Sequence, residues 1–344
     1  MTIHIYIHRV GTKGGAQLVM KKVVEVLNGL KGEFDLHITC SLDGVEKCDL
    51  CDEFFKYNQV FPSSIGELVS NLVLQKELSN KRFDVMITHT LLTPNFVKNN
   101  RYTIVFDGRD WTNFIRTRNL IGKLIEYIPW KIREVQYKNS VIFLINPRNK
   151  DYYLKLYPRK IFLVPNGVDV KLVSSVLPQP KVYDFGFIGR FSPEKNPDLI
   201  INTFKNTQFK GLMIGAPQNR VVGNIEIKKF MNHKKALEEI KKVKIGIIPS
   251  IHEASPLVIL EFLSLGIPVI VSDSIDAPYV KYCETFKCCD GEDLRNVFLR
   301  IHRNYPKYQK KYLKIRRRVM REYNWDLNLA KYLGNMVRDL VLHT

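Results

Sequence analysis

Two carboxylates separated by seven residues mark the part of the chain best suited to chemistry. Glu253 lies in a stretch with loop composition, and Glu261 interrupts the otherwise apolar run Leu257-Val-Ile-Leu-Glu-Phe-Leu-Ser-Leu265. A buried carboxylate without partners costs on the order of several kcal/mol. Glu261 therefore needs hydrogen-bond donors, which adjacent helices or a ligand hydroxyl could supply. By itself, a Glu in such a helix is equally well explained as a capped structural acid.

Two strands and a short helix must position these acids. The β-branched runs 243–248 and 267–271 predict buried strands. The segment between them is apolar on every face, which predicts a buried helix, and Gly266 marks its end.

The start of this helix is predicted from its residue types. Ser255 is expected as the N-cap, and Pro256 fits the first helical position, where its missing N–H costs nothing. The N–H groups of Leu257 and Val258 then have no partner inside the helix. Such amides, together with the helix dipole, form a phosphate site between the two acids.

Two cations follow an earlier strand of the same half of the chain. A strand ending at Gly189 is followed by Arg190 and Lys195, and Asn196-Pro197 are expected to start the next helix as N-cap and first residue. Fixed cations at the carboxyl end of a strand can stabilise negative charge on a bound ligand. Two surface cations alone would be unremarkable.

These residues resemble the signature of the retaining GT-B glycosyltransferases, a large family that includes glycogen synthases and sucrose synthases. The resemblance rests on Glu253-Ala-Ser-Pro-Leu-Val-Ile-Leu-Glu261, Leu265-Gly-Ile-Pro-Val269, the segment Gly189-Arg-Phe-Ser-Pro-Glu-Lys195, and the turn Pro165-Asn-Gly-Val-Asp169. It implies an α/β protein of GT-B architecture, with two Rossmann-like doubly wound domains facing across a cleft. Its landmarks occur in the family's order along nearly the whole chain.

The resemblance also implies roles for these residues. The cations and helix amides would hold the diphosphate of a nucleotide sugar, Glu261 would accept hydrogen bonds from the ribose, and Glu253 would face the sugar at the anomeric carbon. The family is thought to react on one face, with the departing phosphate assisting deprotonation of the acceptor, and neither metal nor cofactor is expected. Catalysis is thereby assigned to Glu253, and donor binding to Arg190, Lys195, Ser255, Leu257, Val258 and Glu261.

The first half of the chain alternates strand and helix. Residues 2–8 predict a strand, 9–15 a loop, 16–30 an amphipathic helix and 34–39 a second strand, which is the βαβ opening of a parallel sheet. Gly14 and Gly15 sit where the strand gives way to the helix, so their backbone can approach a ligand closely. The resemblance places such glycines beside the donor diphosphate or the acceptor.

Candidate acceptor-side residues follow two further strands. His89 follows the strand 84–88, and Asp107 and Arg109 follow the strand 102–106. Ligands in open α/β sheets bind at these carboxyl ends. The family often has a histidine near here, but this chain has Asp107-Gly108 in that neighbourhood. His89 could take the role, although a lone histidine is more often structural.

The domain limits follow from linker composition and from the final helical pattern. Segment 174–181 is rich in Ser and Pro, and the helix from 323 has Trp325 as its apolar anchor. In related enzymes a C-terminal helix of this kind crosses back to the first domain. The expected parts are a first, acceptor-binding domain 1–173, a linker 174–181, a second, nucleotide-sugar-binding domain 182–322, and a returning helix 323–344.

The chain has 344 residues and a formal net charge of +19, which favours anionic partners. Ten basic and no acidic residues lie between Arg300 and Arg321, and the helical stretch 115–137 mixes cations with Trp130. Peripheral contact with an anionic membrane and a solvated helix face are the two interpretations. No apolar segment reaches the roughly 18 residues of a membrane span, so the protein is expected to be cytoplasmic.

Six cysteines are scattered along the chain, and Cys48-Asp-Leu-Cys51 has the spacing of a zinc or redox pair. A metal site would need a second pair of ligands, and only Cys40 is near in sequence. A local disulfide or plain thiols are therefore expected, and no metal.

Two rival functions fit parts of the sequence. A basic protein of this fold that binds nucleic acid or anionic membrane without catalysis would have no need of Glu253 and Glu261. An epimerase or a phosphorylase could share the architecture, but no motif for a pyridoxal-binding lysine is present. The nucleotide base, sugar, acceptor, linkage and oligomeric state are not specified by the sequence.

Overall fold

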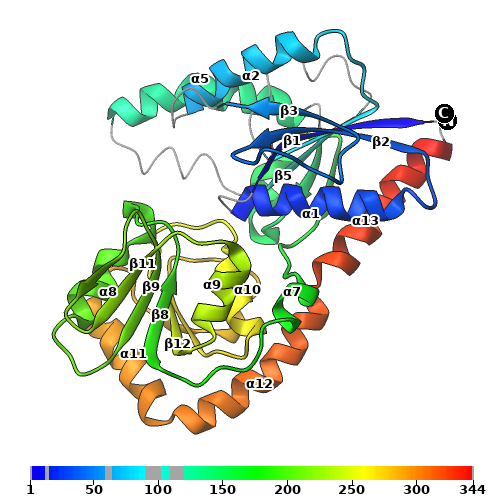
Figure 1. The fold of residues 1–344 in the computed structure, drawn as a ribbon. Coiled ribbons are helices and arrows are strands. Elements are labelled where there is room, and N and C mark those ends of the chain that lie inside the picture. The colour runs from blue at the N-terminus through cyan, green and yellow to red at the C-terminus, as the bar shows by residue number, and fades with distance from the viewer. Residues whose placement is uncertain are drawn as a thin grey trace. The chain divides into compact units, whose positions relative to one another are not determined.

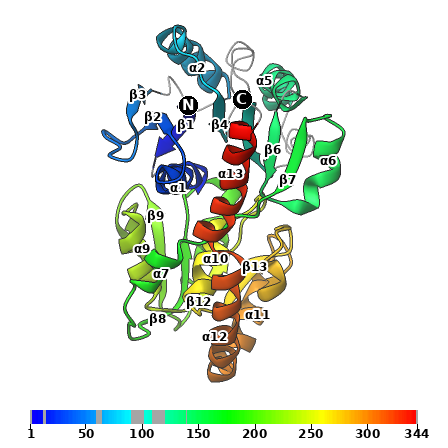
Figure 2. The same cartoon turned by 90° about the vertical axis from the view of Figure 1, so that its right-hand side faces the viewer.

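The computed structural model describes residues 2–11, 15–58, 64–89, 102–108, 120–138 and 140–342. By their internal contacts the residues form two compact units, Met1–Pro165 with Asp326–Thr344, and Asn166–Trp325. Each unit is an α/β sheet with helices on both faces (Figures 1 and 2). Within the described ranges, no helix combines the length and apolar character needed to cross a membrane.

The first unit contains a seven-stranded sheet in the order β3-β2-β1-β4-β5-β6-β7, with every pairing parallel. Parallel strands buried on both faces need crossover helices on each side. The strands are β1 (Ile3–Gly11), β2 (Leu36–Asp43), β3 (Glu53–Tyr57), β4 (Val85–Thr88), β5 (Tyr102–Asp107), β6 (Val141–Leu144) and β7 (Lys160–Leu163).

Helices cover both faces of this sheet. α1 and α13 lie on one face, where the Lys22 ammonium is 2.6 Å from the Asp326 carboxylate and the Tyr332 ring packs on Phe143. α2 and α5 lie together on the other (Figure 1). The helices are α1 (Gly15–Leu30), α2 (Ser64–Leu78), α5 (Leu120–Lys138), η1 (Pro147–Asn149), α6 (Lys150–Leu154) and α13 (Trp325–Leu342).

The opening βαβ unit is confirmed, but several predicted strand boundaries are wrong, and β2 also ends at Asp43 instead of residue 39. β1 continues to Gly11 instead of ending at residue 8, with a register shift between Ile7 and Val10. β2 begins at Leu36 instead of residue 34, because the Phe34 N–H donates to the Leu30 carbonyl at 3.0 Å and keeps Phe34 in the turn after α1.

The second unit contains a second seven-stranded sheet, ordered β10-β11-β9-β8-β12-β13-β14 and parallel except for the antiparallel pair β10–β11. Its strands are β8 (Tyr183–Ile188), β9 (Gly211–Ala216), β10 (Arg220–Val222), β11 (Ile225–Lys229), β12 (Val243–Ile248), β13 (Val269–Ser272) and β14 (Glu284–Phe286).

Successive side chains along the strands of this sheet point to opposite faces, where they form two core layers. Ile245 and Ile247 of β12 point to the layer under α8 and α11, and Ile248 points to the layer under α9, α10 and α12. Figure 1 shows α9 and α10 on one face and α8 and α11 on the other. The helices are α7 (Val170–Ser174), η2 (Pro193–Lys195), α8 (Pro197–Phe204), α9 (His233–Ile240), α10 (Leu257–Ser264), η3 (Val280–Tyr282), α11 (Gly291–Arg303) and α12 (Tyr305–Glu322).

The division into units differs from the expected ranges at both ends of the second unit. Its first residue is Asn166, because the Asn166 side-chain amide donates to the Ser255 carbonyl at 2.8 Å and the Val168 N–H donates to the Tyr323 carbonyl at 2.7 Å. The expected linker 174–181 thus lies wholly inside the second unit. From Asp326 onward α13 clusters with the first unit.

Candidate active site

The candidate site of the second unit lies in the loops that follow β8 and β12, which are neighbours in the sheet. Carboxyl ends of adjacent parallel strands meet at one edge, so these two loops come together. The Ile251 N–H donates to the Glu194 carbonyl at 2.9 Å, which ties one loop to the other. Residues 58 positions apart in sequence are thereby placed in contact.

Lys195 and Glu253 form an ion pair across these loops, with side chains 20% and 15% exposed. Ser250, near the start of the loop after β12, adds a hydroxyl donor, 3.2 Å from the same carboxylate oxygen. The sequence predicted both residues for the site but not their contact. A cation expected at the diphosphate and an acid expected at the sugar thus form an ion pair with each other.

Arg190 lies differently from Lys195. Its side chain is 73% exposed, and its guanidinium is 3.4 Å from the Glu194 carboxylate, one helical turn along the chain. An exposed pair of this kind contributes little stability. Arg190 is therefore free to reorient toward an anion without a large cost.

Gly215 sets the backbone from which Arg190 emerges. It has a φ of +114°, and a Cβ at this position would lie 2.2 Å from the carbonyl oxygen of Gly189. Only glycine fits this close approach of two strand ends.

We therefore expect Gly215→Ala to lower the free energy of unfolding by about 1–3 kcal/mol or more, since it adds backbone strain and a clash. Urea titration measures the change. Gly29→Ala in α1, where a Cβ meets nothing within 4 Å, should keep or raise stability. Equal stability of wild type and Gly215→Ala would contradict the close approach.

The start of α10 differs from its prediction. Pro256, not Ser255, occupies the N-cap position, and no side chain caps the helix. The Ser255 hydroxyl instead lies 3.1 Å from the buried Tyr279 hydroxyl, which also donates to the Pro256 carbonyl at 2.9 Å. A tertiary partner thus replaces the local cap, and Tyr279 fixes the entry of the helix.

Leu257 and Val258 are the first two residues of α10. Within the described part of the chain their N–H groups have no hydrogen-bond acceptor, whereas the Ile259 N–H donates to the Pro256 carbonyl at 3.3 Å. The uncapped start of an eight-residue helix therefore offers two amides for an anion. Glu253 precedes this helix start by four residues, so the amides and the Lys195–Glu253 pair belong to the same loop system.

Glu261 is buried, as the apolar run predicted, and it has a partner. His233, the first residue of α9, places its Nε2 2.8 Å from a Glu261 carboxylate oxygen. The Asn232 side chain caps α9 by accepting from the Lys235 N–H at 2.9 Å and so fixes His233 at the helix start. The expected need for a donor from an adjacent helix is confirmed, although the sequence did not identify His233.

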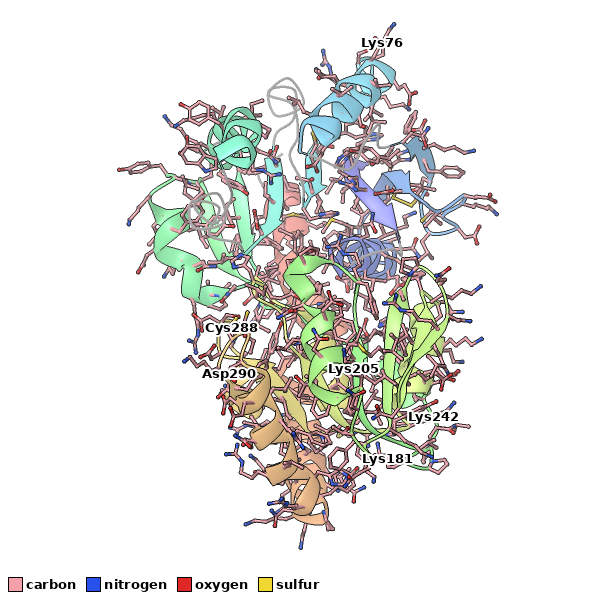
Figure 3. All side chains as sticks on the ribbon, turned by 90° about the vertical axis from the view of Figure 1, so that its left-hand side faces the viewer. Lys76, Lys181, Lys205, Lys242, Cys288 and Asp290 are labelled. Atoms are coloured by element: carbon pink, nitrogen blue, oxygen red, sulfur yellow. A yellow bond between two sulfur atoms is a disulfide. The ribbon has the colours of Figure 1, made fainter. Side chains whose placement is uncertain are left out.

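Asn196 occupies the N-cap position of α8 as predicted, but its side chain caps nothing there. Its φ is +51°, in the left-handed region, and its amide is 3.9 Å from Cys289 Sγ. Cys289 lies in the loop after β14, which also carries Cys288 and Asp290 (Figure 3). That loop is at the same carboxyl edge as Lys195.

The candidates of the first unit are described only in part. Gly14 and Arg109 lie outside the described residues. Gly15 is the exposed first residue of α1, at the strand-to-helix junction that the sequence predicted. Asp107 ends β5, where its carboxylate accepts from the Tyr137 hydroxyl and the Gly108 N–H.

His89 directly follows β4, whose neighbour in the sheet is β5. Burial, and next the Arg9 guanidinium, lower the pKa of His89 to about 4. Its Nε2 is buried without a hydrogen-bond partner among the described residues. His89 is therefore a neutral imidazole at the carboxyl edge of the first sheet.

The unfolded chain binds a proton at His89 below about pH 6.5, whereas the folded chain does not until about pH 4. His89 therefore makes the free energy of unfolding fall as the pH drops from 6.5 to 4. We expect His89→Asn to remove this part of the pH dependence, measured by urea unfolding at pH 7.5 and 4.5. The exposed His4 is the control, and His4→Asn should keep the wild-type profile. An unchanged profile in His89→Asn would contradict the assignment.

Arg9 was not singled out from the sequence, yet it organises the carboxyl edge of the first sheet. Its φ is +56°, and its guanidinium is 2.7 Å from the Asp43 carboxylate and 3.3 Å from that of Glu67. The cation also lies 4.8 Å from the centre of the Tyr57 ring. The feature of the sequence that could have identified Arg9 is its position, a cation at the end of an apolar strand.

The cysteine expectation of a local disulfide is confirmed, with Cys40 of β2 joined to Cys51. The bonded partner is Cys40 and not the closely spaced Cys48. The Cys48 sulfur stays within 4.8 Å of the other two. In the described ranges these three sulfurs are the one grouping of His, Cys, Asp or Glu ligands with metal-site spacing, and it lies outside the candidate active site.

Comparison with solved structures defines the fold. The chain is similar to sucrose-phosphate synthase from Thermosynechococcus elongatus (14% identity, TM-score 0.79, 99% of this chain and 100% of that one) and to WaaG, a glycosyltransferase involved in lipopolysaccharide biosynthesis (12%, 0.76, 96% and 99%). It is also similar to Anabaena HepE in complex with UDP and glucose (10%, 0.69, 97% and 99%). Together with the two sheets, these matches show the GT-B glycosyltransferase fold.

A sequence comparison reaches the same class for part of the chain. Residues 174–281 match the model of the family described as Glycosyl transferases group 1. This range contains Lys195, Glu253, Glu261 and both loops of the candidate site. No curated protein sequence matches the chain.

Proposed function

We propose that the protein is a retaining glycosyltransferase that moves a sugar from a nucleoside-diphosphate donor to an acceptor. The observation that carries the proposal is the contact between Lys195 and Glu253 in the loop system that leads into α10, whose Leu257 and Val258 amides have no acceptor among the described residues. Cation, anion-binding amides and carboxylate are the groups that a diphosphate sugar needs. All of them lie in the range that the glycosyltransferase family matches.

In the proposed complex the diphosphate displaces Glu253 from Lys195. The ammonium and the α10 amides then bind phosphate oxygens, and the exposed Arg190 turns inward to add a second cation. These positive groups stabilise the charge that the leaving phosphate gains as the bond to the sugar breaks. They also supply the neutralisation for which a metal ion would otherwise serve, so we propose that transfer needs no metal and no cofactor.

The released Glu253 carboxylate faces the sugar and stabilises the positive charge that develops at the anomeric carbon. Glu261, held by His233, accepts hydrogen bonds from the ribose hydroxyls. The acceptor binds the first unit, where we propose His89, Asp107 and Arg109 as candidates for the acceptor or sugar side, and Gly14 and Gly15 as donor-binding residues. The departing phosphate takes part in deprotonating the acceptor hydroxyl on the same face.

HepE structures that resemble this chain contain UDP or UDP-glucose, so UDP-sugars are the first donors to test. The test is a thermal-shift panel of UDP, GDP, ADP and their sugar conjugates, with and without EDTA. A ligand at about 100 times its dissociation constant should stabilise the fold by roughly 2.7 kcal/mol. Stabilisation by one diphosphate in the presence of EDTA supports the proposal. If none of the nucleotides or nucleotide sugars stabilises the protein, the proposed donor site is contradicted. The alternative, a binding protein for nucleic acid or anionic membrane, is then favoured.

A further inference from the structure

A basic recess lies in the second unit between α12 and η3, away from the loops of the candidate active site. Its volume is about 540 Å³, which falls in the range of ligand pockets. Six cations line it, namely Lys281, Lys307, Lys310, Lys311, Lys314 and Arg318. The recess is the structural counterpart of the basic stretch 300–321.

The recess is built by helical spacing. Lys307, Lys311, Lys314 and Arg318 recur at intervals of three and four residues, so they form one stripe along α12. The neighbouring stripe of α12 carries the buried Tyr312 and Val319, which fix the helix on the sheet. The basic stripe therefore cannot rotate away from the recess.

η3 supplies the opposite wall and the floor. Tyr282 is 9% exposed, and its hydroxyl donates to the Glu322 carboxylate at 2.8 Å. The Lys281 ammonium lies 5.1 Å and the Arg318 guanidinium 6.0 Å from the centre of its ring. The Tyr282 ring therefore contacts one cation of η3, Lys281, and one cation of α12, Arg318.

The charges of the recess are not balanced by the protein. Glu284 pairs with Lys311 at 2.9 Å, and Glu322 pairs with Arg318 at 2.9 Å. Lys281, Lys307, Lys310 and Lys314 have no carboxylate partner among the described residues, and all four are exposed. Like charges at this helical spacing repel one another, so a multivalent anion would relieve a cost already present in the free protein.

We propose that this recess binds a ligand carrying two or more clustered phosphate groups. Lysine ammonium groups bind phosphate as point charges from several directions, and the recess presents four that are otherwise unpaired. An anionic membrane surface, on which phospholipid headgroups cluster their phosphates, and a soluble polyphosphate share this chemistry. The proposal does not depend on glycosyl transfer, because no residue of the recess belongs to the candidate active site.

The test compares two double variants of the full-length protein. Lys310→Gln/Lys314→Gln removes two unpaired cations of the recess. Arg303→Gln/Arg317→Gln removes two exposed cations of α11 and α12 that do not line it, so both variants lose the same net charge. Circular dichroism and thermal unfolding verify that both fold.

Binding is measured by calorimetry with tripolyphosphate and by flotation with phosphatidylglycerol vesicles against neutral phosphatidylcholine vesicles, at about 50 mM salt to limit screening. We expect the recess double variant to lose about 30-fold in affinity for the bound probe, which is about fivefold for each of the two cations. The Arg303/Arg317 double variant should stay within a few-fold of wild type. Tripolyphosphate binding identifies a soluble ligand, and vesicle binding alone identifies a lipid headgroup.

In a Lys195→Ala background, in which the donor site is weakened, Lys310→Gln/Lys314→Gln should still lower the affinity for the probe by about 30-fold relative to Lys195→Ala alone. Two results would overturn the proposal. One is equal weakening in both double variants, which would mean a general effect of net charge. The other is that wild type binds neither probe.

Discussion

Glu253→Gln should lower the rate of sugar transfer by about 10²–10³-fold while the protein stays folded, which is the loss seen when one preorganised electrostatic group is removed from a transition state. Glutamine keeps the shape of the side chain and can still accept from the Ser250 hydroxyl, now 3.2 Å from the carboxylate. What it loses is the negative charge opposite the anomeric carbon. The effect should therefore fall on kcat.

Donor binding should respond in the opposite direction. Lys195 is held by Glu253 in the free protein, so loss of the Glu253 charge releases the ammonium for the diphosphate. We expect Glu253→Gln to bind UDP as tightly as wild type or more tightly, measured by calorimetry beside single-turnover transfer. A uniform rise in Kd with unchanged turnover would show that Glu253 acts only in binding.

Glu239→Gln is the matched control for this variant. Glu239 lies in α9, its side chain is 14% exposed against 15% for Glu253, and its carboxylate is 2.8 Å from the ammonium groups of Lys228 and Lys242. It is a half-buried acid paired with lysine in the same unit but outside the candidate site. Its substitution should change stability and leave transfer unchanged, so a similar loss of turnover in both variants would point to general destabilisation.

Local sequence patterns specified most of the second unit. The β-branched runs around β12 and β13 are buried on both faces, and such runs are strands of a parallel sheet. The apolar helix between them and the need of Glu261 for a donor follow from burial alone. These features could be predicted because each depends on residues within one turn or one strand.

Features that depend on distant residues were missed. Ser255 has the residue type of an N-cap, but its hydroxyl forms a hydrogen bond with the Tyr279 hydroxyl. Pro256 occupies the N-cap position instead. His233 and Glu261 are 28 residues apart in sequence, and the residues next to either one do not indicate that the two side chains pair. The unit boundary at Pro165 likewise follows from the bond between Asn166 and Ser255 rather than from linker composition.

Lys195→Ala should weaken binding of the donor diphosphate by about 10–150-fold, since a hydrogen bond to a charged group contributes about 1.5–3 kcal/mol. Lys195 lies in the turn before α8, held against the β12 loop by the bond between Glu194 and Ile251. Its ammonium is thus held against Glu253, in the loop that leads into α10. Removal of the ammonium should abolish the thermal shift produced by the bound diphosphate at moderate concentration.

The same variant leaves Glu253 without its cation, so part of any loss could reflect a misplaced carboxylate. Lys195→Ala/Glu253→Gln separates the two causes, because the double variant has no unpaired acid to repel the diphosphate. If Lys195 binds phosphate directly, the double variant should still bind UDP more weakly than Glu253→Gln alone. Recovery to the affinity of Glu253→Gln would show that Lys195 serves only to hold the acid.

Two lysines of the same unit serve as controls for Lys195→Ala. Lys228 has a similarly buried side chain, 24% exposed against 20% for Lys195, and its ammonium is 2.8 Å from the Glu239 carboxylate. Lys205 lies at the opposite end of α8 from Lys195 (Figure 3). Alanine at either position should leave UDP affinity unchanged, because neither ammonium is at the edge where β8 and β12 end. A comparable loss at Lys205 would mean that the net charge of the unit, and not the placement of Lys195, governs binding of the diphosphate.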